Sequence, residues 1–210
     1  MTRRVVAVVA PEPASDNAFP SQALRAAMVE DVYEMVAGLA LVQPVLAVPG
    51  HSGAADDLAG LVWPGTLLLT VPGGSSSYDI LAQLAGQGAD EAVLVAGDAP
   101  DLPPLLVGKL YRALGTADVA VLPAGGGGLV GLAARCPLPT WLAGSGAGLD
   151  VAAAQTMLQQ AAPRRSAVAL GPGWHRVRRP EDLRQLDPGL EGWEITQAAL
   201  RDPANGAPVG

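Results

Sequence analysis

Runs of consecutive apolar residues alternate along this chain with stretches in which apolar residues recur at helical spacing. A short apolar run bounded by Gly, Pro or Asp is typical of a strand that is buried on both faces. Such runs predict strands at 5–10, 45–48, 67–71, 91–96, 118–122, 129–133 and 167–170. The stretches between them predict helices at 21–38, 54–60, 75–87, 101–115, 150–161, 180–186 and 194–201.

This alternation of strands and helices predicts an α/β fold, a three-layer α/β/α arrangement with a mostly parallel central sheet. The length of 210 residues suits one domain. We place that domain at residues 1–202. Residues 203–210, which are rich in Pro, Gly and Ala, predict a flexible tail.

Composition and charge narrow the function classes. The formal net charge is -7, which argues against a nucleic-acid partner, because binding to phosphate backbones needs clustered Lys and Arg. The single cysteine, Cys136, cannot form an internal disulfide and is expected to be a buried thiol. The first apolar run stops at Ala10, too early for a signal peptide, and no apolar stretch is long enough to span a bilayer. We therefore expect a cytoplasmic protein without a membrane partner, as a monomer or a homodimer.

The candidate chemistry is concentrated where the strand at 91–96 ends in Gly97-Asp98. Ligands of open α/β sheets bind at the carboxyl ends of the strands. Carboxylates at such a position can hold a divalent cation against a phosphate. Asp98 is therefore a candidate metal ligand, although it also suits a structural turn. Asp101 is either a supporting carboxylate or the N-cap of the following helix.

Two glycine-rich segments are further candidates for holding a phosphate. Gly73-Gly74-Ser75 opens a predicted helix, whose N-terminus attracts anions, but the same residues suit plain capping. Gly126 and Gly127 belong to a G-x-G-x-x-G match at 126–131. A dinucleotide site would need a helix there, whereas the pattern favours a strand. We expect the glycine run to line a cleft with Asp98 and the loop at 11–20.

The remaining residues that could carry chemistry favour structural roles. His51 and His175 lack the spacing of a zinc site, and one cysteine does not complete one. Trp174 is interpreted as a core or interface residue rather than as a base-stacking one.

The order of these signals resembles a known superfamily. The segments that carry the resemblance are 97–103, 117–124, 129–132 and 179–183. Across about residues 66–187 the chain resembles a divergent member of the nucleotide-diphospho-sugar transferases, which have the glycosyltransferase-A-type fold. The most similar branch comprises proposed glycosyltransferases related to 2-phospholactate guanylyltransferase and to the molybdenum-cofactor nucleotidyltransferases.

The resemblance implies a partner and a site. The partner would be a nucleotide or a nucleotide-sugar, and the activity would be nucleotidyl or glycosyl transfer. Asp98 matches the residue that helps to bind a catalytic Mg²⁺, which neutralises the nucleotide phosphates. Gly97 would lie beside the same ligand, and Asp101 would support the site.

Three departures from the family pattern change this expectation. The loop at 11–20 has two acids and no cation where relatives hold phosphate with Lys and Arg. The run at 125–128 lacks the acid and the aromatic residue of relatives. Arg176 and Arg178 stand where relatives carry acids that complete the metal site.

The two arginines admit three interpretations. A guanidinium stays charged and opposes a metal cation, but it binds phosphate directly with two parallel hydrogen bonds. Arg176 and Arg178 could therefore hold a phosphorylated ligand without metal, mark a loss of catalysis, or lie in a solvated surface turn. We expect a transferase-like protein with a degraded metal site whose ligand binding does not require Mg²⁺. The alternatives are a catalytically silent binder of nucleotides or proteins and a dinucleotide-dependent enzyme.

Overall fold

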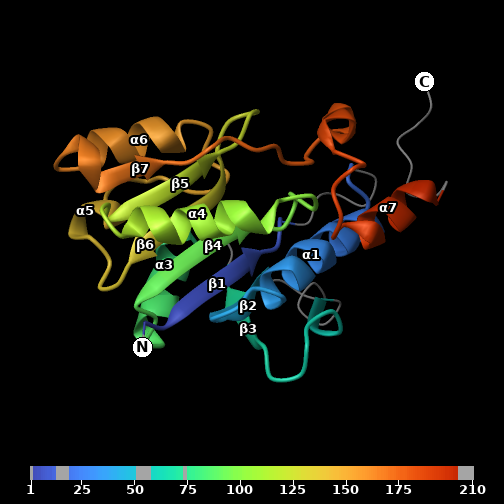
Figure 1. The fold of residues 1–210 in the computed structure, drawn as a ribbon, viewed down its shortest axis with the longest axis horizontal. Helices are drawn as coiled ribbons and strands as arrows, with labels where there is room; N and C mark the ends of the chain where they lie inside the picture. The colour runs from blue at the N-terminus through green and yellow to red at the C-terminus, as the bar shows by residue number, and fades with distance from the viewer. Residues whose placement is uncertain (1, 13–18, 51–57, 73–74, 203–210) are drawn as a thin grey trace.

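The computed structural model describes residues 2–12, 19–50, 58–72 and 75–202, and the strands of these residues form one seven-stranded sheet (Figure 1). The strand order is β3-β2-β1-β4-β6-β5-β7. All but one strand run in the same direction, so the predicted α/β fold with a mostly parallel sheet is confirmed. The strands are β1 (Arg4–Val9), β2 (Val42–Pro49), β3 (Leu67–Val71), β4 (Glu91–Ala96), β5 (Val119–Pro123), β6 (Leu129–Arg135) and β7 (Val168–Leu170).

β6 is the strand that runs antiparallel to its neighbours, β4 and β5. Its beginning pairs with the ends of those strands, because Leu129 lies opposite Pro123 and Gly131 lies opposite Val95. The turn before β6 therefore lies at the same edge of the sheet as the carboxyl ends of the parallel strands.

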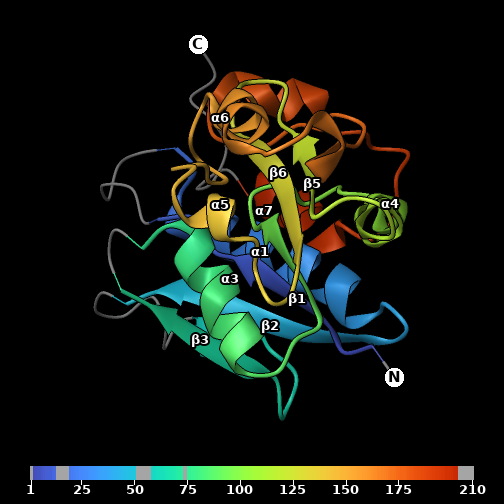
Figure 2. The same cartoon turned by 90° about the vertical axis from the view of Figure 1, so that its left-hand side faces the viewer.

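Helices cover both faces of the sheet, as Figure 2 shows end-on. Alternate strand residues divide between the two faces. Val6 and Val8 of β1 pack with α1 and α4, whereas Val5 and Ala7 pack with α3, α5 and α6. The helices are α1 (Gln22–Ala37), α3 (Ser77–Gly86), α4 (Pro104–Leu114), α5 (Thr140–Ala143), α6 (Ala154–Ala161) and α7 (Glu194–Arg201), with 3₁₀ turns at Arg165–Ala167 and Pro180–Gln185.

The C-terminal segment, residues 171–202, returns to the carboxyl edge of the sheet after β7. Its last helix, α7, packs on α1. Leu24 and Met28 of α1 form a small core with Val177 and Trp193. The buried Asp31 carboxylate caps α7 by accepting hydrogen bonds from the backbone N–H groups of Ile195 (3.2 Å) and Thr196 (2.7 Å). Burial raises the pKa of Asp31 above its ordinary value, although these hydrogen bonds act in the opposite direction.

Three elements begin at least three residues from the predicted position: β2, α6, and α4, which starts at Pro104 instead of 101. β2 starts at Val42 and includes Pro44, which is tolerated because β3 pairs only from Val45 onward. α6 starts at Ala154 rather than at Asp150. The carbonyl of Leu149 accepts a hydrogen bond from Leu129 of β6, so the chain before Ala154 is held by tertiary contacts instead of helical ones.

The other predicted elements agree with the structure to within a few residues, although 180–186 forms a 3₁₀ turn instead of an α-helix. Most of the helix predicted at 54–60, and the tail predicted at 203–210, lie outside the described residues. No helix among the described residues is both long and apolar enough to cross a membrane.

Candidate functional site

Asp98 lies just beyond the carboxyl end of β4 and is almost fully buried, with 3% of its surface exposed. The residue before it, Gly97, lets the backbone pass close to β1 and α1. A Cβ at Gly97 would lie 3.0 Å from the carbonyl oxygen of Val9 and 3.0 Å from Val29 of α1. The backbone N–H of Gly97 donates to the same carbonyl of β1 at 2.9 Å. Gly97, predicted as a ligand-binding residue, thus has a clear packing function in the structure.

Arg176 forms a two-point ion pair with Asp98. Its Nη2 lies 2.9 Å from Oδ2 of Asp98, and its Nε donates to Oδ1. Only 5% of the Arg176 side chain and 4% of the Asp98 side chain are exposed. The interpretation of Arg176 as part of a solvated surface turn was therefore wrong: the buried carboxylate requires a partner charge, and Arg176 supplies it.

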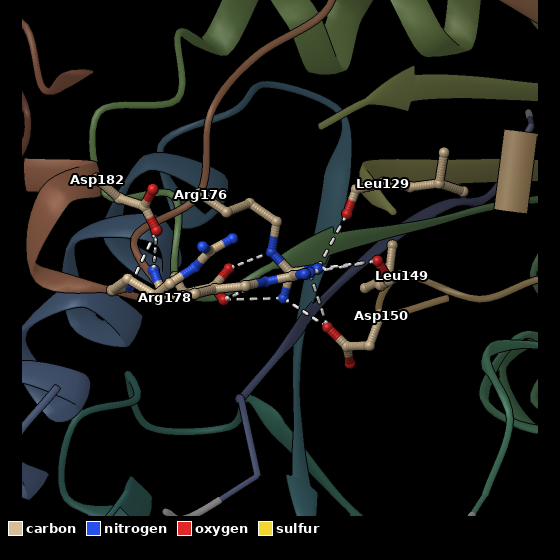
Figure 3. A network of polar contacts seen from close by, with 8 residues as sticks. Leu129, Leu149, Asp150, Arg176, Arg178 and Asp182 are labelled. Carbon is tan, nitrogen blue, oxygen red and sulfur yellow. Dashed lines mark hydrogen bonds and ion pairs between the residues drawn. The ribbon is translucent and has the colours of Figure 1, made fainter. Parts of the chain in front are cut away.

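The rest of the Arg176 guanidinium is bound as well (Figure 3). Nη1 donates to the carbonyl oxygens of Leu129 at 3.1 Å and of Leu149 at 2.9 Å. Nη2 lies 2.9 Å from Oδ1 of Asp150. The start of the reversed strand β6 and the segment before α6 thus fix the guanidinium in one orientation.

Arg178 lies beside this pair and is more exposed, with 33% of its side chain accessible. Its Nη2 lies 3.0 Å from Oδ1 of Asp150, and its Nε lies 3.6 Å from Oδ2 of Asp98. Burial, and after it the charge of Arg176, lower the pKa of Arg178. The Asp182 carboxylate accepts from the backbone N–H of Arg178 at 3.0 Å, which holds this part of the chain in place (Figure 3).

A cavity of about 350 Å³ opens beside these charges. Its lining combines the charged cluster with parts of the loop at 11–20 that the structure describes. The lining residues are Pro11, Glu12, Phe19, Pro20, Arg25, Asp98, Asp150, Arg176, Val177 and Arg178. The loop and Asp98 thus meet at one cavity, as expected.

The glycine run does not line this cavity, although it lies beside the same arginines. Gly126 and Gly127 form the turn between β5 and β6 and line a second cavity of about 40 Å³, which also contains Arg176 and Arg178. The G-x-G-x-x-G match leads into β6 and not into a helix, so it cannot present a helix N-terminus to a pyrophosphate. The dinucleotide interpretation of this motif was therefore wrong.

Asp101 does not cap α4, so the capping interpretation was wrong. The N-cap of α4 is Pro103, which offers no side-chain acceptor. The fully buried Asp101 carboxylate accepts instead from Nε1 of Trp174 at 3.2 Å and from the backbone N–H of Asp187 at 3.1 Å. Nε2 of His175 lies 2.9 Å from its Oδ2.

Sequence reasoning missed this cluster because its members are distant in sequence. Trp174 and His175 stack on each other with ring centroids 4.9 Å apart. Their contacts with Asp101 hold the C-terminal segment against the loop after β4. His175 directly precedes Arg176, so these contacts also position that arginine. The sequence signal for this cluster was weak. Two carboxylates, Asp98 and Asp101, follow the end of one strand, and a carboxylate that is buried there needs a hydrogen-bond donor or a positive charge.

Of the candidates before α3, the structure places only Ser75. Ser76, not Ser75, is the N-cap of α3, and it forms a capping box with Asp79. Ser75 does not line the cavity beside Asp98. Gly73 and Gly74 lie outside the described residues.

The residues around Asp98 do not fit a Mg²⁺ ion. Both carboxylate oxygens of Asp98 accept from Arg176, whose positive charge occupies the space between Asp98 and Asp150. Among residues 2–12, 19–50, 58–72 and 75–202, no group of three His, Cys, Asp or Glu side chains could hold a metal ion. The cluster is instead a pair of guanidinium groups with two carboxylates, and guanidinium groups bind phosphate oxygens.

Comparisons with known proteins identify the fold. No family model matches the sequence, and no curated protein matches it either. Among solved structures, the chain resembles a proposed nucleotide-diphospho-sugar transferase from Desulfovibrio desulfuricans G20 with a TM-score of 0.70 and 19% identity over 94% of each chain.

Two further structures contain nucleotides. The chain resembles a CMP:2-keto-3-deoxy-manno-octonic acid synthetase complexed with CTP, with a TM-score of 0.62 and 15% identity over 87% of this chain and 96% of that one. It also resembles glucosyl-3-phosphoglycerate synthase from Mycobacterium tuberculosis in complex with Mg²⁺ and UDP, with a TM-score of 0.55 and 16% identity over 86% of this chain and 74% of that one. The chain thus has the fold of the nucleotide-diphospho-sugar transferases.

Proposed function

We propose that the chain binds a nucleotide or a nucleotide-sugar in the cavity beside Asp98 and acts as a nucleotidyl- or glycosyltransferase-like protein. The observation that carries the proposal is the pair of guanidinium groups, Arg176 and Arg178, at the carboxyl edge of the sheet. In open α/β proteins this edge is where ligands bind. The similar structures that hold CTP and UDP support the choice of a nucleotide.

We also propose that binding does not require a divalent metal. Asp98 is engaged by Arg176 through both oxygens, so it does not offer a free carboxylate to a cation. Arg178 lies 3.6 Å from the same carboxylate and adds a second positive charge. In this arrangement the protein's own guanidinium groups supply the charge that faces the ligand phosphates.

A catalytically silent nucleotide-binding protein is the second candidate. It is favoured by the same replacement of acids by Arg176 and Arg178, since a transferase that depends on Mg²⁺ would lose its activity with the metal. The two candidates predict the same binding and differ in turnover.

The experiment is calorimetry on the full chain with the common nucleoside triphosphates and with UDP- and GDP-sugars, each with Mg²⁺ and with EDTA. We expect at least one of these ligands to bind with equal affinity in both conditions. A pyrophosphate-release assay and a sugar-transfer assay then separate the transferase from the silent binder. Absence of binding by every nucleotide would contradict the proposal, and turnover that appears only with Mg²⁺ would contradict its metal-independent part.

A further inference from the structure

Asp150 is exposed to solvent and also contacts a buried arginine. Its side chain is 73% exposed, yet its Oδ1 lies 2.9 Å from Nη2 of the buried Arg176 and 3.0 Å from Nη2 of Arg178 (Figure 3). The same side chain lines the cavity beside Asp98. A single carboxylate oxygen therefore lies between two guanidinium groups, at the boundary between the cluster and the open cavity.

The charges of the cluster balance only while Asp150 takes part. Arg176 and Arg178 carry two positive charges, and Asp98 and Asp150 carry two negative ones. The pair of Asp98 and Arg176 is buried and is held by further hydrogen bonds to the carbonyls of Leu129 and Leu149. If Asp150 moves away, these four groups are left with one positive charge in excess, and both arginines line the cavity.

Moving Asp150 costs little compared with moving Asp98. Water screens the charge of the exposed Asp150, so its ion pairs stabilise it only weakly, whereas breaking a buried pair leaves a charge without solvent. Asp150 also precedes α6 by four residues, so its displacement does not interrupt that helix. The cluster thus has one fixed carboxylate and one exchangeable carboxylate.

We infer that Asp150 holds the place of an anionic phosphate group of the ligand. This inference rests on the proposed function, since it names the part of the ligand that the two arginines recognise. An oxygen of the terminal phosphate, or of a pyrophosphate, takes the position of Asp150 Oδ1 between Arg176 and Arg178. Asp150 then turns into solvent, and the arginines bind the phosphate without a bridging metal ion.

The test measures the affinity of inorganic pyrophosphate and of a nucleoside triphosphate in EDTA at one ionic strength. Asp150→Asn removes the competing charge, and we expect it to lower the Kd for pyrophosphate about fivefold, as suits a competitor that forms an exposed ion pair. Glu191→Gln removes the same charge at an exposed residue outside the cavity lining and should leave the Kd unchanged. Both variants should melt at the wild-type temperature.

A double-mutant cycle separates competition from a general charge effect. In an Arg178→Ala background, Asp150→Asn should gain clearly less affinity than in the wild type, because Asp150 then competes at one guanidinium instead of two. Equal gains in both backgrounds would overturn the inference. So would an unchanged or higher Kd in Asp150→Asn, or binding that requires Mg²⁺.

The two ligands keep this inference apart from the proposed function. If pyrophosphate binds more tightly to Asp150→Asn while no nucleotide binds, the inference stands and the nucleotide proposal fails. If nucleotides bind to the wild type but Asp150→Asn binds neither ligand more tightly, the proposed function stands and the inference fails.

Discussion

Arg176 and Asp98 bind each other through two points inside the protein, although 78 residues separate them in the sequence. Replacement of Arg176 by Met should lower the free energy of unfolding by about 3–5 kcal/mol, because it leaves the Asp98 carboxylate buried without its counter-charge. Equilibrium unfolding in urea measures this loss.

A matched control is Arg164→Met, since Arg164 is 60% exposed and lies 3.7 Å from Asp118 in a surface pair. We expect that variant to change stability by less than about 1 kcal/mol. The double variant Arg176→Met with Asp98→Leu should be more stable than Arg176→Met alone. A loss in Arg176→Met no larger than in the control would show that the pair has little energetic weight.

Replacement of Arg178 by Ala should weaken nucleotide or pyrophosphate binding by about tenfold, the effect of losing one charge-assisted hydrogen bond of about 1.4 kcal/mol. The protein should remain folded, because a third of this side chain is exposed and Arg176 still neutralises Asp98. Calorimetry measures the affinity. The neighbouring Arg179→Ala is the control: Arg179 is 66% exposed and lies outside the lining of the larger cavity, so its loss should not change the Kd.

The cap of α7 by Asp31 predicts a pH effect on stability. Because burial raises the pKa of Asp31 in the folded protein, the folded state holds its proton more strongly than the unfolded chain does. This residue's contribution to stability is therefore greatest below the ordinary Asp pKa of about 4 and falls as the pH rises through the raised pKa. Asp31→Asn should melt at a temperature that changes less with pH above about 4 than the wild type does. If the melting temperatures of the wild type and of Asp31→Asn changed equally with pH in that range, Asp31 would not be the source of the pH effect.

Gly128 and Gly127 both have positive φ angles, +80° and +93°, but they differ in the space beside them. A Cβ at Gly128 would lie 2.4 Å from the carbonyl oxygen of Leu149, which accepts from Arg176, whereas one at Gly127 would meet Ala152 at 3.4 Å. Gly128→Ala should therefore be less stable than Gly127→Ala by about 1 kcal/mol or more, beyond the backbone cost of about 1–2 kcal/mol that both share.

Gly128→Ala should also weaken pyrophosphate binding, since the displaced carbonyl of Leu149 orients the Arg176 guanidinium. Thermal melting compares the two variants, and calorimetry compares their binding. Equal melting temperatures would contradict the prediction, because they would mean that the Leu149 carbonyl moves away from the added methyl group at no cost in stability.

The fold was largely predictable because the central strands β1, β4, β5 and β6 are buried on both faces. That burial requires continuous apolar runs, and the run 91–96 coincides with β4 in the structure. Where an observed element boundary differs from the predicted one, contacts with residues distant in sequence set it. The start of α6 is an example, because Leu149 accepts a hydrogen bond from Leu129 rather than from its own helix.

Sequence reasoning brought out three residues of the charged cluster but missed their pairing and missed Asp150. Five other candidates that the structure describes do not line the cavity beside Asp98: Ser75, Gly97, Asp101, Gly126 and Gly127. The end of the strand at 96 marked Asp98, and the departure from the family pattern marked Arg176 and Arg178. Local pattern does not encode which acid each arginine binds, because such contacts join segments that only the tertiary fold brings together. For the same reason Asp101 was misassigned to a cap, since its partners at 174, 175 and 187 follow more than 70 residues later.

The return of the C-terminal segment to the carboxyl edge has a consequence for the order of synthesis. Arg176 follows all seven of the described strands, so a growing chain can complete the whole sheet before the partner of Asp98 exists. Until then the carboxylate at the end of β4 lacks the guanidinium that pairs with it in the complete chain, and burial of its charge is unfavourable. Burial of Asp98 at that edge is thus coupled to one late residue. A chain that ends before 176 lacks both guanidinium groups of the charged cluster and the C-terminal residues that pack on α1.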